Sequence, residues 1–307
     1  MRVLVTGAGG YIGRAVVEAL GRAGHEPVAM VHSDRPTVVT VDTESRAGDL
    51  LRVGSLVDAV RGVDAVCHLA GLTRARESWE QPLRYFAVNV GGTLALLEAM
   101  AANDVSVVVF ASTGSIYGTP ERQPMSEGLP DAPLHPYAAS KQAAESAIEW
   151  QARAGGLGAV VLRLFNVAAG ADPDPTRIVP RVLAVAAGES PSVEVNGDGS
   201  AVRDFLHVDD AAQAFVAALD AGPRVGAFRR YTIGSGVGTS VRDVVTAAGR
   251  VTGRPIPVIH RPSAVEPQAL VCDPTRAAAD LGWKPRRSDL DTIVGDAWVA
   301  HGQSGRE

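Results

Sequence analysis

Cysteine is scarce in this 307-residue chain, which contains only Cys67 and Cys272. Two thiols so far apart cannot build the disulfide framework of a small secreted protein or a cysteine-rich metal site. The seven histidines show no His-x-His or His-Glu-x-x-His spacing, so the sequence predicts no metal centre. We therefore expect reduced cysteines, with Cys67 a small buried residue of a strand.

Excess positive charge and long apolar segments are also missing. The net charge is −5 and the pI is near 5.8, so no basic stripe favours nucleic acid or an anionic membrane surface. No segment approaches the roughly 18 uninterrupted apolar residues of a membrane span. Met1 and Arg2 lead directly into an apolar strand pattern without a cleavable leader. We expect a protein of the reducing cytoplasm with no nucleic-acid or membrane partner.

Lysine is also scarce, because only two of the 29 lysine and arginine residues are lysine. One of them, Lys141, follows Tyr137 by four residues, and positions i and i+4 lie on the same face of a helix. An ammonium held beside a phenol favours the phenolate and lowers a pKa that is otherwise about 10. The pair therefore predicts a tyrosine that takes and returns a proton near neutral pH.

The first half of the chain alternates short β-branched runs with Ala- and Leu-rich amphipathic stretches, which is typical of a parallel sheet covered by helices. We expect strands at 2–6, 27–31, 65–68, 105–111 and 158–164, and helices near 13–24, 56–61, 85–103 and 138–154. This order predicts an α/β fold, a doubly wound parallel sheet (Rossmann fold) with a smaller C-terminal substrate-binding lobe. We assign 1–166 and about 204–235 to the dinucleotide-binding domain, and 167–203 and 236–307 to the lobe.

A glycine-rich turn after the first strand predicts a dinucleotide site. Gly7, Gly10 and Gly13 would supply the tight turn, the close approach of the backbone to a pyrophosphate, and the packing of helix on strand. The N-terminus of the helix that contains Tyr11 and Ile12 would then face the phosphates. Glycines also serve ordinary turns, but their position in a β-turn-α unit favours nucleotide binding.

The second strand should end near an acidic residue that binds the adenosine ribose. Asp34 is the candidate, although His32 stands where the acid is expected and Arg35 could meet a 2′-phosphate. The residues alone therefore leave both NAD and NADP open. Asp49 and Leu50 lie where a pair contacting the adenine would fall, although solvation at the surface explains a lone aspartate equally well.

Further motifs are spread over nearly the whole chain. They are His68–Leu72, Asn89–Thr93, Ser112–Gly118, Tyr137 with Lys141, Arg163–Asn166, Arg203–Val208 and Leu281–Trp283. With the glycine turn, they make the chain similar to the extended short-chain dehydrogenase/reductases, and more narrowly it resembles the UDP-glucose (UDP-galactose) 4-epimerases. The sequence departs from the family pattern at 167–170 and 261–264, which leaves the exact sugar open.

The resemblance implies roles for individual residues. The catalytic set would be Thr113, Tyr137 and Lys141, with threonine where many relatives have serine. The cofactor would also be bound by Leu69, Ala70, Gly71, Asn89 and Phe165. Besides Thr113 and Tyr137, the residues that hold the sugar nucleotide would be Asn166, Ile178, Arg203 and Arg261. The two arginines would bind its diphosphate, a role that suits the guanidinium.

The implied function is a nucleotide-sugar 4-epimerase that interconverts sugars of the UDP-glucose and UDP-galactose type by transient C4 oxidation with bound NAD, in a homodimer. An NAD(P)H-dependent 4-ketoreductase is the alternative, and a non-catalytic nucleotide-binding protein is a third reading. Gly114 and Ser115 replace the Asp-Glu pair of a 4,6-dehydratase. Arg177 either contacts the sugar or caps its loop, and we favour the loop.

Overall fold

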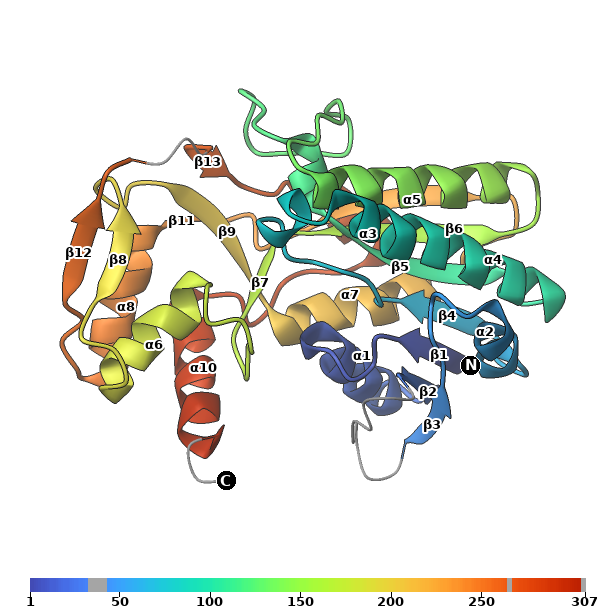
Figure 1. Ribbon diagram of the computed structural model, residues 1–307, viewed down its shortest axis with the longest axis horizontal. Helices are drawn as coiled ribbons and strands as arrows, with labels where there is room; N and C mark the ends of the chain where they lie inside the picture. The colour runs from blue at the N-terminus through green and yellow to red at the C-terminus, as the bar shows by residue number, and fades with distance from the viewer. Residues whose placement is uncertain (33–42, 264–266, 305–307) are drawn as a thin grey trace.

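The computed structural model describes residues 1–32, 43–263 and 267–304. Its larger part is a seven-stranded parallel sheet with the order β10-β6-β5-β4-β1-β2-β3 (Figure 1). The strands are β1 (Arg2–Thr6), β2 (Glu26–Val31), β3 (Glu44–Ala47), β4 (Ala65–His68), β5 (Val107–Thr113), β6 (Gly158–Leu164) and β10 (Phe228–Ile233). The predicted doubly wound α/β fold is thus confirmed.

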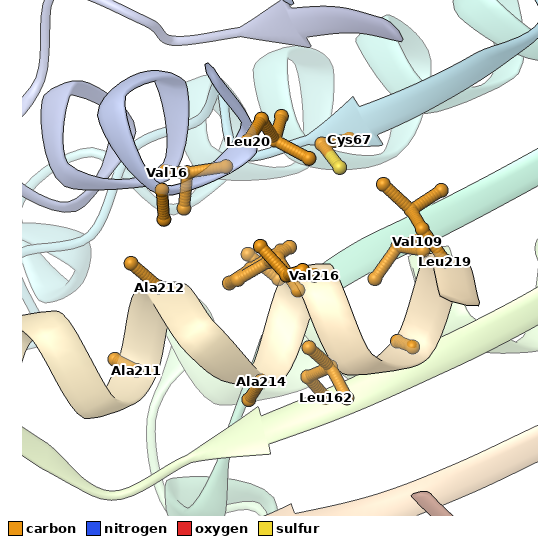
Figure 2. Close-up of a cluster of buried hydrophobic side chains, with 14 of the residues drawn as sticks. Val16, Leu20, Cys67, Val109, Leu162, Ala211, Ala212, Ala214, Val216 and Leu219 are labelled. Atoms are coloured by element: carbon orange, nitrogen blue, oxygen red, sulfur yellow. The ribbon is translucent and has the colours of Figure 1, made fainter. Parts of the chain in front are cut away.

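Helices cover both faces of this sheet, and successive side chains of each strand point alternately to the two faces. α1 (Tyr11–Arg22) and α7 (Val208–Asp220) pack on one face, and α2 (Val53–Val60), α4 (Gly92–Ala102) and α5 (Pro136–Arg153) pack on the other. Val3 and Val5 face α1 and α7, whereas Leu4 faces the opposite core, because successive side chains of a strand point to opposite faces. Figure 2 shows Val16 and Leu20 of α1 above α7, near the sheet residue Cys67, which is buried as predicted.

One helical segment is continuous from Pro82 to Ala102. It comprises α3 (Pro82–Phe86), a single π-helical turn η2 (Ala87–Gly91) and α4. Within the described residues it is the one helix long and apolar enough to cross a membrane, with a mean hydropathy of 1.3, but α4 packs its apolar side chains into the core of the sheet. The π-turn is the feature that matters for function, because such turns often mark functional sites, and this one contains the buried Asn89.

The smaller lobe lies to the left in Figure 1 and contains short sheets covered by helices. Its strands are β7 (Asn166–Ala168), β8 (Val193–Asn196), β9 (Val202–His207), β11 (Gly238–Ser240), β12 (Val258–Arg261) and β13 (Ala269–Leu270). Its helices are α6 (Ile178–Ala187), α8 (Val241–Thr252) and α10 (Leu290–Ser304), whose buried side chains form a separate core.

The chain passes between the two parts more than once. β7 follows β6 after one residue, so the main sheet leads directly into the lobe. Within 236–307, α9 (Thr275–Leu281) and Trp283 return to the main sheet, because Ala277 and Trp283 lie in the core formed with α1 and α7. The division of the chain into the two predicted domains stays a prediction.

Candidate active site

The glycine turn lies where the strand order of the main sheet reverses. β1 has β2 on one side and β4 on the other, and dinucleotides bind beyond the carboxyl ends of the strands at such a switch point. Gly7 has a φ of +70, and a Cβ there would lie 2.8 Å from the Ala70 nitrogen. A Cβ on Gly13 would lie only 2.0 Å from the Gly7 carbonyl oxygen. The turn is therefore a surface of bare backbone, which fits a pyrophosphate.

The residues that begin α1 connect this turn to its surroundings. Gly10 donates its N–H to the Gly7 carbonyl at 2.9 Å and is the N-cap of α1. The Tyr11 phenol donates to the Ala169 carbonyl and so links α1 to the lobe, while Ile12 packs against the core. The side chains of both residues are thus engaged with protein, and their contact with a cofactor stays a prediction.

The structure describes some of the residues predicted to bind the adenosine part of the cofactor. Asp34 lies outside the described residues. The Asp49 carboxylate is 3.6 Å from Nε2 of His32, so the two side chains that flank the predicted ribose position face each other. Leu50 is buried, and a Cβ on Gly92 would lie 2.7 Å from the Leu50 Cβ. Adenine contact by Asp49 and Leu50 stays a prediction.

The turn 69–72 after β4 carries the contacts predicted for the nicotinamide. Asn89 holds this turn, because its Oδ1 accepts from the Leu72 N–H at 2.8 Å and its Nδ2 donates to the Leu72 carbonyl at 3.0 Å. A Cβ on Gly71 would lie 2.8 Å from Asn89 Oδ1 and 3.6 Å from Lys141 Nζ. The structure therefore brings Gly71, Asn89 and Lys141 together.

Thr113 and Tyr137 meet at the same edge of the sheet. Thr113 ends β5, and its hydroxyl oxygen accepts from the Ser115 N–H at 3.1 Å. Tyr137 is the second residue of α5, after Pro136 at the first helical position. The Thr113 side chain is hydrogen-bonded to the Tyr137 phenol. Two of the three residues proposed as catalytic are thus in contact.

Two aromatic side chains that sequence reasoning missed enclose the Tyr137 ring. His135 is stacked on it, with ring centroids 5.8 Å apart and planes inclined by 2°, and Tyr85 meets it edge-on at 6.4 Å. His135 also caps α5, because its Nδ1 accepts from the Ala138 N–H at 3.1 Å. The His-Pro dipeptide before Tyr137 could have revealed His135, since proline favours the first position of a helix. Tyr85 has no such local signal.

Burial raises the pKa of Tyr137 above its ordinary value of 10.0. The hydrogen bond from Thr113 and the positive charge of Arg177 both act to lower that pKa, but they do not offset the loss of water around the phenol. The direction is the opposite of the one predicted from the spacing of Tyr137 and Lys141. Arg177, rather than Lys141, is the cation that acts on the phenol in this structure.

Lys141 is directed toward β5. Its Nζ donates to the Ala111 carbonyl at 2.9 Å and lies 4.5 Å from the centroid of the Phe110 ring. Burial lowers the pKa of Lys141 from 10.5 to about 8, while the charge of Glu145 acts to raise it. A buried lysine with a pKa so close to neutral is typical of a functional site.

A buried ion cluster stands behind these residues. Arg163, which is fully buried on β6, donates to Glu145 at 3.0 and 2.7 Å and to Asp131 at 2.6 and 2.9 Å. Glu145 also accepts from the hydroxyl of Ser112, the next-to-last residue of β5. Because Glu145 follows Lys141 by four residues on α5, the cluster fixes that helix against β5 and β6. Sequence reasoning missed it, since nothing local indicates that these residues meet.

The residues predicted for the sugar nucleotide lie on the lobe side. The Phe165 ring packs on Gly114, where a Cβ would lie 2.8 Å from it, so Phe165 is adjacent to the end of β5. Asn166 is exposed on β7 and donates to the Asp204 carbonyl at 3.2 Å. Phe165 and Asn166 therefore lie near the edge of the sheet that carries Thr113, and their contact with a sugar nucleotide stays a prediction.

The remaining predicted substrate residues are more widely spread. Ile178 begins α6. Arg203 donates from Nη1 to the carbonyls of Val202 and Pro267, at 2.8 and 2.9 Å. Arg261 is about half exposed and forms an ion pair with Glu194 on the neighbouring strand β8. To hold a diphosphate, Arg261 would therefore exchange a carboxylate for a phosphate.

Arg177 is both a loop residue and a site residue. Its Nη1 is 3.3 Å from the Val167 carbonyl and 3.2 Å from Asp172 Oδ2, so it makes the loop contact that we favoured. Its charge also reaches Tyr137 and lowers the pKa of that phenol. The position just before Ile178 thus places a cation close enough to act on Tyr137.

Comparison with known proteins agrees with this geometry. Residues 3–234 match the family model described as the NAD dependent epimerase/dehydratase family. The chain is 39% identical to the UDP-glucose 4-epimerase of Streptomyces lividans over 98% of this chain and 96% of that protein. It is 38% identical to the UDP-glucose 4-epimerase of Lacticaseibacillus casei over 98% of this chain and 97% of that protein.

The chain is also similar to solved structures of proteins that bind NAD and UDP-sugars. A UDP-glucose-4-epimerase from Stenotrophomonas maltophila, with bound NAD and formylated UDP-arabinopyranose, superimposes with a TM-score of 0.94 at 30% identity, covering 100% of this chain and 99% of that one. MoeE5, in complex with UDP-glucuronic acid and NAD, superimposes with a TM-score of 0.89 at 32% identity, covering 99% and 100%.

Proposed function

This chain belongs to the NAD dependent epimerase/dehydratase family, and we propose that it is a UDP-sugar 4-epimerase that acts by transient oxidation at C4 with bound NAD. The observation that carries the proposal is the contact between Thr113 and Tyr137, beside the turn that holds Gly71 near Lys141. Similarity to UDP-glucose 4-epimerases over nearly the whole of each chain supports it.

The residues present fit NAD. The backbone of Gly7 and Gly13 leaves no room for a Cβ, and the first turn of α1 directs its free N–H groups beyond the end of β1. Asp34 would bind the adenosine ribose, and Lys141 the nicotinamide ribose. When bound there, NAD would supply the hydride-transfer chemistry at C4 of the sugar.

The protein would move the proton. Tyr137, as a phenolate, removes the proton of the sugar O4 hydroxyl while C4 is oxidised, and it returns that proton when the 4-keto sugar is reduced. Thr113 orients O4 through its hydroxyl. Because burial raises the pKa of Tyr137, the phenolate needs a nearby donor and positive charge, which Thr113 and Arg177 would supply.

The sugar nucleotide would lie between the sheet and the lobe. Asn166 and Ile178 would contact it, Arg203 and Arg261 would bind its diphosphate, and Phe165 would pack on the nicotinamide side. UDP-glucose is the expected substrate, from the relatives of highest identity described above.

A homodimer is part of the proposal. Apolar side chains that are exposed on the adjacent helices α3, α4 and α5 would be covered by a second copy: Leu83, Phe86, Leu94 and Trp150. Trp150 is 72% exposed and Leu83 is 84% exposed. Large apolar side chains that are exposed on neighbouring helices favour an interface there. We place the enzyme in the cytoplasm, in keeping with two free cysteines.

A 4-ketoreductase remains the alternative, because it would use the same tyrosine and lysine. The two enzymes differ in the fate of the cofactor. An epimerase keeps NAD bound and regenerates it in each turnover, whereas a ketoreductase consumes NAD(P)H and releases the oxidised form. The NAD content of the purified protein and its activity without added cofactor therefore distinguish them.

Tyr137→Phe tests the proposal. We expect the conversion of UDP-glucose to UDP-galactose, measured without added cofactor, to fall by about 10²-fold or more, while NAD stays bound. Tyr231→Phe is the matched control, because Tyr231 is a buried tyrosine in the main sheet outside the site, and it should retain activity. An unchanged turnover in Tyr137→Phe would refute the mechanism.

A further inference from the structure

Five buried polar residues form a continuous hydrogen-bonded chain from the glycine turn to α5, linked by their side chains and by the backbone carbonyl of Asn89. They are Thr6, His68, Thr93, Asn89 and Ser140, and none is more than 2% exposed. Thr6 ends β1 immediately before the glycine turn, and Ser140 lies on α5, where its hydroxyl donates to the Tyr137 carbonyl at 2.8 Å. An apolar core would be simpler here, since buried polar groups are costly unless all of them are paired.

The bonds at Thr6 determine where its proton points. Its Oγ1 accepts from the backbone N–H groups of Leu69 and Ala70, each at 3.1 Å. A hydroxyl has two lone pairs and one proton, so both lone pairs are occupied. The proton must therefore be donated to Nδ1 of His68, which lies 2.8 Å away.

This donation fixes the state of the imidazole. Because Nδ1 of His68 accepts a hydrogen bond from Thr6, it carries no hydrogen, and the neutral ring has its hydrogen on Nε2. Nε2 then donates to Oγ1 of Thr93 at 3.1 Å, and the Thr93 hydroxyl donates to the Asn89 carbonyl at 2.6 Å. The hydrogen bonds thus run in a single direction from Thr6 to Asn89, and every proton in the run has an acceptor.

The far end of the chain returns to the same turn. Asn89 pairs with both backbone groups of Leu72, and its Nδ2 also donates to Oγ of Ser140 at 2.9 Å. The segment from Leu69 to Leu72 is therefore held at its start by Thr6 and at its end by Asn89. His68 is the side chain that joins these two anchors.

We propose that His68 is a positioning residue for the cofactor: locked as the Nε2–H tautomer, it fixes the turn 69–72 in the conformation that receives the nicotinamide. The proposal rests on the proposed function, because it takes this turn to be the cofactor contact.

Two features agree with a permanently neutral His68. Burial, together with the smaller effect of the Lys141 charge, lowers its pKa to about 3. The Phe110 ring is near both groups, with its centroid 5.4 Å from the His68 ring centroid and 4.5 Å from Lys141 Nζ. A proton added at Nδ1 would face the Thr6 hydroxyl proton, and Thr6 would have to release Leu69 or Ala70 to accept it.

A pair of variants separates the two halves of the chain. In His68→Asn the amide oxygen can replace Nδ1 as the acceptor for Thr6. In His68→Gln the amide can still donate toward Thr93 but leaves Thr6 without an acceptor. We expect His68→Gln to weaken NAD binding about tenfold or more, and to regain turnover when NAD is added. His68→Asn should retain NAD more tightly than His68→Gln.

The control is a histidine with a similar burial elsewhere. His207 is 2% exposed, lies in the lobe and pairs with Asp296 at 3.0 Å. His207→Asn should alter thermal stability without changing the NAD content per folded protein. Equal NAD affinity in His68→Gln and wild type, or equal loss in His207→Asn, would overturn the proposal, since it would leave His68 with only a general role in stability.

A measurement on the unmodified protein tests the tautomer independently of activity. Nitrogen-15 NMR of the histidine rings should show His68 with an unprotonated Nδ1 and a protonated Nε2, unchanged between pH 5.5 and 8. Protonation at Nδ1 would refute the hydrogen-bond assignment. If the wild-type protein neither retained NAD nor epimerised UDP-glucose, the proposed function would fail, while the NMR result would still report on His68.

Discussion

Replacing Lys141 with methionine should stabilise the nucleotide-free protein while abolishing its turnover. The Lys141 ammonium is 3% exposed, and burial lowers its pKa from 10.5 to about 8. This difference in pKa corresponds to a cost of about 3 kcal/mol for keeping the side chain charged in the folded state at pH 7. Methionine fills the same space without a charge but loses the hydrogen bond to Ala111 and the contact with Phe110, worth about 1–2 kcal/mol together. We expect a net gain of about 1–2 kcal/mol.

The pH dependence of this gain is the sharper test. Between pH 8 and 10.5 the unfolded chain binds more protons at Lys141 than the folded chain does, so the stability of the wild type rises with pH across this window. Above 10.5 both states are neutral and the cost disappears. The advantage of Lys141→Met should therefore be largest below pH 8 and should vanish, or reverse, as the pH approaches 10.5.

Urea unfolding of both proteins, stripped of nucleotide and compared from pH 7 to 10.5, measures the effect. Lys284→Met is the matched control, because Lys284 is the other lysine of the chain and is exposed; its effect on the free energy of unfolding should be within about 0.5 kcal/mol at every pH. A destabilised Lys141→Met at pH 7, or a gain that does not change with pH, would show that burial of the ammonium is not costly.

Three further predictions concern the turn, the ion cluster and the interface. Gly13→Ala should lose most of its bound NAD, because the alanine Cβ would lie 2.0 Å from the Gly7 carbonyl oxygen. Gly21→Ala on the same helix is the control and should keep its NAD, because a Cβ there would have no atom within 4 Å. The NAD content of each protein after gel filtration measures the difference. Arg163→Met should lower the free energy of unfolding by about 3–5 kcal/mol, because it removes the buried cation that pairs with both Glu145 and Asp131 and leaves Arg230 as the remaining ion-pair partner of Glu145; an unchanged urea midpoint would contradict this. Trp150→Glu should convert a dimer into a monomer in analytical ultracentrifugation, and a monomeric wild type would disprove the interface.

The sequence was sufficient for the parts of the fold that local patterns encode. The apolar runs at 2–6, 65–68 and 158–164 are strands of the main sheet, with the same bounds, because buried parallel strands read as continuous apolar segments. The glycine turn after the first strand could also be predicted from the sequence, since close packing leaves no room for a Cβ at Gly13. The strand predicted at 105–111 is found at 107–113, an offset expected at element ends.

The arrangement of charges could not be predicted in the same way. The spacing of Tyr137 and Lys141 indicates that they share a helix face, but it does not reveal that Lys141 donates to Ala111 or that burial dominates the pKa of the phenol. His68 and Asn89 belong to recognisable motifs, yet their link through Thr93 exists only in three dimensions. Contacts between distant segments decide these properties.

The junction between β6 and β7 has a mechanical consequence. Only Phe165 separates the last strand residue of the main sheet from the first of the lobe, and its ring rests on Gly114. A change in the position of the lobe at this junction would therefore also move the Phe165 ring against Gly114, the residue next to Thr113. The backbone thus couples the position of the lobe directly to the packing around the proposed reacting centre.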